Sequence, residues 1–101
     1  MKNIKIIVKK PNEAPFIDII PDTLQAMQKL VGGYIETVSI ASNLVVVGNE
    51  EGRLMNLPYN CSVFGIDFCG TIFLIGRDEK WDFADVPISL EDANLYGFLR
   101  K

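Results

Sequence analysis

Histidine is absent from the 101-residue sequence. This absence excludes Ser-His-Asp and Cys-His nucleophile systems and removes the commonest metal ligand, so it disfavours an enzyme. Only two cysteines are present, and the spacing of Cys61 and Cys69 matches neither a zinc site nor a thioredoxin motif. We interpret both as buried, reduced core thiols, and we expect neither a metal nor a cofactor.

Long apolar runs and an excess of positive charge are also missing. No run approaches the roughly 18–20 apolar residues of a membrane helix, and the basic N-terminus lacks the apolar stretch of a signal peptide. We therefore expect an intracellular, cytoplasmic protein. The sequence contains 10 Lys and Arg and 13 Asp and Glu, which gives a net charge of −3. This charge argues against a general nucleic-acid binder.

What is present fits one globular domain. Hydrophobic residues make up 49% of the chain, enough for a core, and domains most often contain roughly 100–150 residues. The pattern therefore predicts a single domain over residues 1–101.

The first third of the sequence predicts two strands and a helix. Near alternation of β-branched residues with lysine indicates a strand over residues 4–9, and residues 16–20 complete a β-hairpin after a loop with two prolines. Asp22 is the expected N-cap of a helix over residues 22–31, and Gly32-Gly33 ends it.

The middle of the chain continues with strands. Residues 34–40 alternate, Leu44–Val47 are apolar enough for a central strand, and residues 48–52 form a turn after which 53–55 resume as a short strand. We expect neighbouring strands along the chain to pair antiparallel. Residues 49–51 are better explained by turn chemistry than by a metal site, which needs more oxygen ligands.

The remaining segments are more varied. The composition predicts a loop over residues 56–60, irregular structure or a turn of helix over 61–67, and a buried strand over 70–76. A polar loop over 77–87 follows, in which Trp81 and Phe83 are expected to pack on the body; exposure would instead suit a protein interface. A capping box at Ser89 predicts a C-terminal helix to Leu99.

Together these elements predict an α+β fold. It comprises a mostly antiparallel sheet of about five strands, one packed helix and a C-terminal helix.

Four residues after the 48–52 turn form a candidate ligand site. Amides and a tyrosine hydroxyl can read hydrogen-bonding edges, while a guanidinium can hold a phosphate. The alternative is a proline-fixed connection whose asparagines bond their own backbone. The candidates are Arg53, Asn56, Tyr59 and Asn60.

Acidic residues concentrate in the last quarter of the chain. They form either a solvated face or a surface that repels phosphate and engages a basic partner protein. The candidates for partner contact are Asp78, Glu79, Asp82 and Asp85.

A set of segments in the first three quarters of the chain carries a family resemblance, namely Leu24-Gln25 through Val31-Gly32-Gly33-Tyr34-Ile35-Glu36, then Asn49-Glu50-Glu51-Gly52, Leu57-Pro58 with Asn60, and Gly70-Thr71. Taken together, these segments resemble the domain of unknown function 3846 family. The resemblance covers roughly residues 2–76, whereas the tail from Arg77 carries no matching motif. The family implies a setting in Gram-positive bacteria, their phages and mobile elements, some relatives lying beside anti-restriction functions, but it implies no activity, cofactor or catalytic residue.

These observations favour a non-enzymatic accessory protein of a phage or mobile element. It would inhibit a host defence system, either by binding a protein through the acidic face or by sequestering a small nucleotide near Arg53 and Asn60. One alternative is a small histidine-independent enzyme acting on a nucleotide or peptide, with Glu50, Glu51 or a lysine as base. The other is a subunit of a homo-oligomer that pairs through an apolar strand edge.

Overall fold

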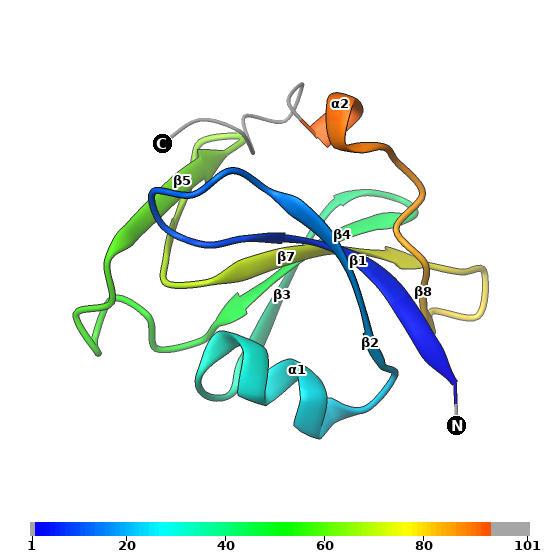
Figure 1. The fold of residues 1–101 in the computed structure, drawn as a ribbon, viewed down its shortest axis with the longest axis horizontal. Coiled ribbons are helices and arrows are strands. Elements are labelled where there is room, and N and C mark those ends of the chain that lie inside the picture. Colours follow the sequence, from blue (N-terminus) through cyan, green and yellow to red (C-terminus); the bar gives the residue numbers. More distant parts are fainter. Residues whose placement is uncertain (1, 94–101) are drawn as a thin grey trace.

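An antiparallel sheet of six strands forms the centre of the protein (Figure 1). The computed structural model describes residues 2–93. Five of the strands run side by side in the order β2-β1-β7-β4-β3, and β8 pairs with β7 beside them. Their bounds are β1 Asn3–Lys9, β2 Phe16–Pro21, β3 Ile35–Ala41, β4 Leu44–Asn49, β7 Ile72–Arg77 and β8 Phe83–Ala84.

Both faces of the central strands are buried, which explains why their sequences are almost continuously apolar. Side chains alternate between the two faces along each strand. In β4, Val45 and Val47 join one hydrophobic cluster, whereas Leu44 and Val46 join the other. The expectation of a central strand at Leu44–Val47 is confirmed.

One face of the sheet is covered by α1 (Leu24–Val31), which contributes Met27 and Val31 to the core (Figure 1). The expected helix is therefore present, but its cap is not Asp22. The hydroxyl of Thr23 accepts a hydrogen bond from the Ala26 N–H at 3.1 Å, and Asp22 lies before the cap. The expected stop is correct, because Gly32 adopts a left-handed φ of 83°.

The opposite face is covered by a separate two-stranded sheet, β5 (Tyr59–Val63) and β6 (Ile66–Cys69), and by the short α2 (Leu90–Ala93). The Asp92 N–H donates to the Ser89 hydroxyl at 3.1 Å, which is the hydrogen bond that an N-capping serine accepts. The rest of the helix expected to reach Leu99 lies outside the described residues.

The β5–β6 hairpin and the turn that precedes it correct three expectations. Residues 53–55 form a turn rather than a strand, Tyr59 and Asn60 are in a strand rather than a loop, and residues 61–67 are regular rather than irregular. The turn residues Phe64 and Gly65 both have positive φ, 49° and 80°, as a two-residue hairpin requires. A phenylalanine gives no sequence signal for that conformation.

Strand pairing was predicted only for hairpins. The β1–β2 and β3–β4 pairs are antiparallel as expected. However, β7 pairs with both β1 and β4, so a late segment occupies the middle of the sheet. The described chain contains eight strands in two sheets, not about five in one.

Two strands, β2 and β3, form the ends of the five-strand order. The apolar side chains of Ile17 and Ile19 on β2 are exposed, as a strand-paired oligomer would need. However, the Asp18 carboxylate accepts a hydrogen bond from the Ile19 N–H at 2.8 Å. This bond occupies one of the donors that edge-to-edge pairing would use.

Within residues 2–93, neither helix has the length and apolar character needed to cross a membrane.

Candidate functional site

An open cleft of about 460 Å³ lies between β6 and the turn that follows β4. The turn supplies residues 50–54, β6 supplies Ile66–Cys69, and Glu36 comes from β3. The cleft therefore contains Arg53, one of the four predicted ligand residues.

The turn beside the cleft is anchored by Asn49, a buried side chain at the end of β4. Its Nδ2 donates to the Val31 carbonyl at the end of α1 at 3.1 Å, and its Oδ1 accepts from the Glu51 N–H at 2.8 Å. One amide therefore fixes the turn to the helix. Gly52 completes the turn, since a Cβ there would lie 2.7 Å from the Cys69 carbonyl oxygen.

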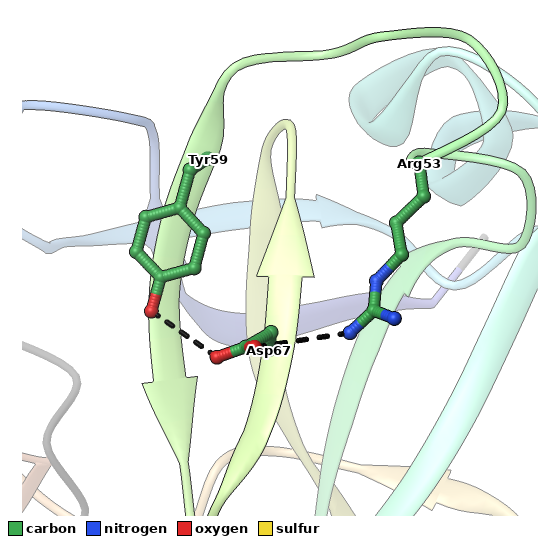
Figure 2. Close-up of polar contacts among 3 residues, drawn as sticks. All are labelled: Arg53, Tyr59 and Asp67. Carbon is green, nitrogen blue, oxygen red and sulfur yellow. Dashed lines mark hydrogen bonds and ion pairs between the residues drawn. The ribbon is translucent and has the colours of Figure 1, made fainter.

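Two of the predicted residues, Arg53 and Tyr59, converge on Asp67. Figure 2 shows Asp67 on β6 between the tyrosine on β5 and the arginine on the turn. The Tyr59 hydroxyl donates to the carboxylate at 3.3 Å, and an Arg53 Nη lies 3.9 Å from its other oxygen. Because the Arg53 and Asp67 side chains are 71% and 53% exposed, this ion pair is weak.

The Tyr59 phenol has a pKa above its ordinary value of 10.0. Desolvation is the largest cause, and the neighbouring Asp67 carboxylate adds to it by its charge and by accepting the phenol proton in a hydrogen bond. Tyr59 is therefore a neutral hydrogen-bond donor at physiological pH.

The other two predicted residues lie elsewhere. Asn60 is 0% exposed, and its Nδ2 donates to the carbonyls of Lys9 and Gly70, both at 2.8 Å. Asn56 is exposed, with a positive φ of 54°, and closes the turn by donating its backbone N–H to the Arg53 carbonyl. The structure thus brings Arg53 and Tyr59 together, whereas Asn60 ties distant backbone segments together and Asn56 closes a local turn.

Carboxylates dominate the cleft. Four of them line it against a single guanidinium, that of Arg53. Within residues 2–93, no group of three or more acidic or cysteine side chains could hold a metal ion. The acidic residues of the cleft are Glu36, Glu50, Glu51 and Asp67.

A second exposed site is formed by the loop 78–82 between β7 and β8. Its backbone is closed by hydrogen bonds from the Asp78 N–H to the Asp82 carbonyl at 2.9 Å and from the Trp81 N–H to the Asp78 carbonyl at 3.0 Å. Trp81 has a positive φ of 68° and is 68% exposed. The expectation that Trp81 packs on the body is therefore wrong, whereas Phe83 is half-buried as expected.

The four acidic partner candidates have different environments. The Asp78 carboxylate accepts from the Lys80 and Asp82 N–H groups, and the Asp85 carboxylate accepts from the Lys5 N–H at 2.8 Å. Glu79 and Asp82 are exposed, and in the described part of the chain their carboxylates make no hydrogen bond or ion pair. Two of the four therefore fix backbone and two face solvent.

Arg77 links the loop to the sheet. Its guanidinium carbon lies 5.5 Å from the centre of the Trp81 ring and 5.1 Å from that of Phe83. Beside it is a hollow of about 250 Å³ that also includes Ser42 and Asn43 from the β3–β4 turn.

Sequence reasoning missed Asp67 and the stacking of Arg77. No local signal marks Asp67, because its role depends on the hairpin that places it between Tyr59 and Arg53. For Arg77, the pattern of an arginine followed by two aromatics at positions 81 and 83 was present. Had a hairpin turn been predicted over residues 78–82, the stacking of Arg77 on these aromatic rings would have followed.

By its fold, the chain is a small α+β protein built on a mostly antiparallel sheet. It belongs to the family described as Domain of unknown function (DUF3846), whose model matches residues 4–96. The resemblance to this family is confirmed and extends well beyond residue 76, where the recognisable motifs end. No curated protein and no solved structure matches the chain.

Proposed function

We propose that this is a non-enzymatic binding protein that recognises a basic surface of another protein through the loop 78–82. The observation that carries the proposal is the exposure of Trp81 on a loop whose backbone is fixed. Tryptophan and arginine are among the residue types most enriched in the side chains that dominate binding energy. Here the two are stacked on each other, and most of the Trp81 side chain still faces solvent.

The rigidity of the loop supports a binding role. Ordering a flexible loop on association costs free energy that lowers affinity. In this loop the Asp78 carboxylate already accepts two backbone N–H groups, and the Trp81 N–H is already bonded. The conformation that presents Trp81 therefore exists before any partner arrives.

The charge of the loop indicates the kind of partner. Glu79 and Asp82 place two solvent-facing carboxylates beside Trp81, with Lys80 as the single cation of the loop. A lysine or arginine on the partner can lie over the indole ring in a cation–π contact and pair with these carboxylates. A basic protein surface suits this chemistry, and a phosphate does not.

The biological setting is part of the proposal. The family resemblance implies phages and mobile elements, so we propose that the partner is a component of a host defence system and that binding inhibits it. Sequestration of a nucleotide near Arg53 is less well supported, because four carboxylates line that cleft. An enzymatic role is less well supported because the chain has no histidine.

Photo-crosslinking from the loop tests the proposal. A photoreactive phenylalanine at position 81 should crosslink a host protein, while the same residue at the exposed position 25 on α1 should not. The identified protein is then purified and titrated against the wild-type chain. Trp81→Ala and Glu79→Lys/Asp82→Lys should each weaken binding at least tenfold, whereas Glu13→Lys/Asp22→Lys should not.

Two results would overturn the binding proposal. One is equal crosslinking from positions 81 and 25. The other is an affinity for the captured protein that the loop variants leave unchanged. Asp85 is left intact in every variant, since its carboxylate holds the Lys5 N–H and reversing it would disturb the fold.

The proposed inhibition of a host defence system is tested in cells. Expression of the wild-type chain should restore phage plaques on bacteria that carry the defence system of the captured protein, and Glu79→Lys/Asp82→Lys should not. Restoration by both chains, or by neither, would contradict the anti-defence part of the proposal.

A further inference from the structure

The hollow beside the loop 78–82 is lined by side-chain donors that have no acceptor. It has a volume of about 250 Å³ and lies where the β3–β4 turn meets the loop. Its donors are the Ser42 hydroxyl, the Asn43 amide and the Arg77 guanidinium. Among residues 2–93, none of these three side chains makes a hydrogen bond or an ion pair. Donors that converge without an acceptor suit a ligand that supplies one.

Arg77 is the strongest of these donors, because it is charged and partly desolvated. Its guanidinium carbon lies 5.5 Å from the centre of the Trp81 ring and 5.1 Å from that of Phe83. Its Nε is buried and has no acceptor within the described residues, whereas its two Nη atoms are unpaired but not buried. The guanidinium has therefore lost part of its hydration without gaining an acceptor from this chain. An acceptor that binds the Nη atoms has correspondingly less water to displace.

The Asp78 carboxylate does not neutralise Arg77, although it lines the same hollow. Its Oδ1 accepts the N–H groups of Lys80 and Asp82 at 2.9 and 3.0 Å, and it makes no ion pair with the guanidinium. A charged acceptor gives the strongest hydrogen bonds, and a planar carboxylate matches the guanidinium. A doubly charged phosphate is disfavoured, because Glu79 also borders the hollow. The acceptor that fits is therefore a carboxylate.

We propose that Arg77 binds one carboxylate side chain of the partner protein, an aspartate or glutamate beside the basic residue that contacts Trp81. Ser42 and Asn43 donate to the same carboxylate. This inference rests on the proposed function and adds its specificity. Attraction between acidic and basic surfaces is common to many proteins, whereas an acidic residue next to a basic one must match both the hollow and the loop. Arg77 therefore fixes the register of the partner.

Two synthetic peptides test the proposal, acetyl-Lys-Gly-Asp amide and acetyl-Lys-Gly-Asn amide, which differ only in the carboxylate. They are titrated into isotope-labelled wild-type chain and followed by NMR at the Trp81 indole N–H and the Arg77 Nε–H. The Asn peptide has the greater positive charge, so general attraction to an acidic protein favours it. The Asp peptide should nevertheless bind about fivefold more tightly, because hydrogen bonds to a charged group are stronger than neutral ones.

Variants assign the preference to the hollow. Arg77→Met removes the guanidinium and should abolish the preference, so that the Asn peptide binds at least as tightly as the Asp peptide. Arg53→Met removes the same charge at the β6 cleft and should keep the preference. The ratio of the two affinities is compared within each protein, because a looser loop weakens both peptides and leaves their ratio unchanged. The wild-type comparison is decisive even without a folded variant.

Three outcomes overturn the inference. They are equal binding of the two peptides by wild type, no binding of either peptide, and a preference for the Asp peptide that survives in Arg77→Met. Its failure is distinguishable from failure of the proposed function. Equal shifts of the Trp81 indole N–H by both peptides would leave the loop as a site for basic groups and remove only the role of Arg77. A preference that requires Arg77, together with equal crosslinking from positions 81 and 25, would instead remove the protein partner.

Discussion

The side-chain amide of Asn60 donates a hydrogen bond to the backbone carbonyl of Lys9 at 2.8 Å, across a sequence separation of 51 residues. The same amide donates to the Gly70 carbonyl at 2.8 Å, and the side chain is completely buried. Asn60 therefore ties the β5–β6 hairpin to the end of β1. The layer that forms one wall of the cleft depends on this side chain.

Replacing Asn60 by alanine should destabilise the fold. Two buried carbonyls would lose their donor, and each such loss costs about 1–3 kcal/mol. We expect the free energy of unfolding, measured by urea denaturation, to fall by about 2–4 kcal/mol on that basis. The exposed amide of Gln25 provides the control, and Gln25→Ala should change stability by no more than about 0.5 kcal/mol. Equal stability of Asn60→Ala and wild type would contradict the assignment.

Asn49→Ala should loosen the turn beside the cleft. The substitution removes the donor to the Val31 carbonyl and the acceptor of the Glu51 N–H. We expect a loss of about 1–3 kcal/mol and faster hydrogen exchange at the Glu51 amide. Asn3→Ala, on an exposed strand position, should change neither quantity. Unchanged exchange at Glu51 in Asn49→Ala would show that the turn is held by other contacts.

Local patterns predicted the elements whose signals lie within a few residues. The β1–β2 hairpin, the helix that ends at Gly32, the central β4 and the buried β7 all follow from periodicity and from glycine or proline punctuation. The place of β7 between β1 and β4 could not be predicted this way, because pairing between distant strands depends on the whole core. The N-cap is Thr23 and not the expected Asp22. Both residue types cap helices well, and the sequence does not decide between two neighbouring candidates.

The candidate sites were predicted in part. Arg53 and Tyr59 meet, but only through Asp67, whose position depends on the hairpin turn at Phe64-Gly65. Trp81 is exposed because backbone hydrogen bonds and the Asp78 carboxylate close its loop. The sequence shows only an aromatic residue in a polar segment, and this does not predict how the loop is closed.

Trp81 is the single tryptophan of the chain, so its fluorescence reports on the loop alone. Its exposure predicts efficient quenching by acrylamide and only a small emission shift on unfolding. Arg77→Met removes the guanidinium that stacks on the ring, and such a contact contributes about 0.5–1 kcal/mol at exposed sites. We therefore expect lower fluorescence anisotropy and stronger quenching in this variant. Arg53→Met, the matched change at the cleft, should leave both values unchanged, and identical quenching in all three proteins would contradict the stack.

Burial gives Cys61 a pH-dependent contribution to stability. Desolvation, the larger cause, raises the pKa of its thiol above 9.0, and the Lys9 ammonium acts in the opposite direction. The unfolded chain therefore releases this proton at a lower pH than the folded chain. The stabilisation is fully present below the ordinary thiol pKa and is lost as pH rises through the folded value. Urea midpoints measured from neutral pH to above 9.0 should fall more steeply for wild type than for Cys61→Ala. Cys69→Ala keeps Cys61 and should retain the steep decline, whereas parallel curves for wild type and Cys61→Ala would refute the assignment.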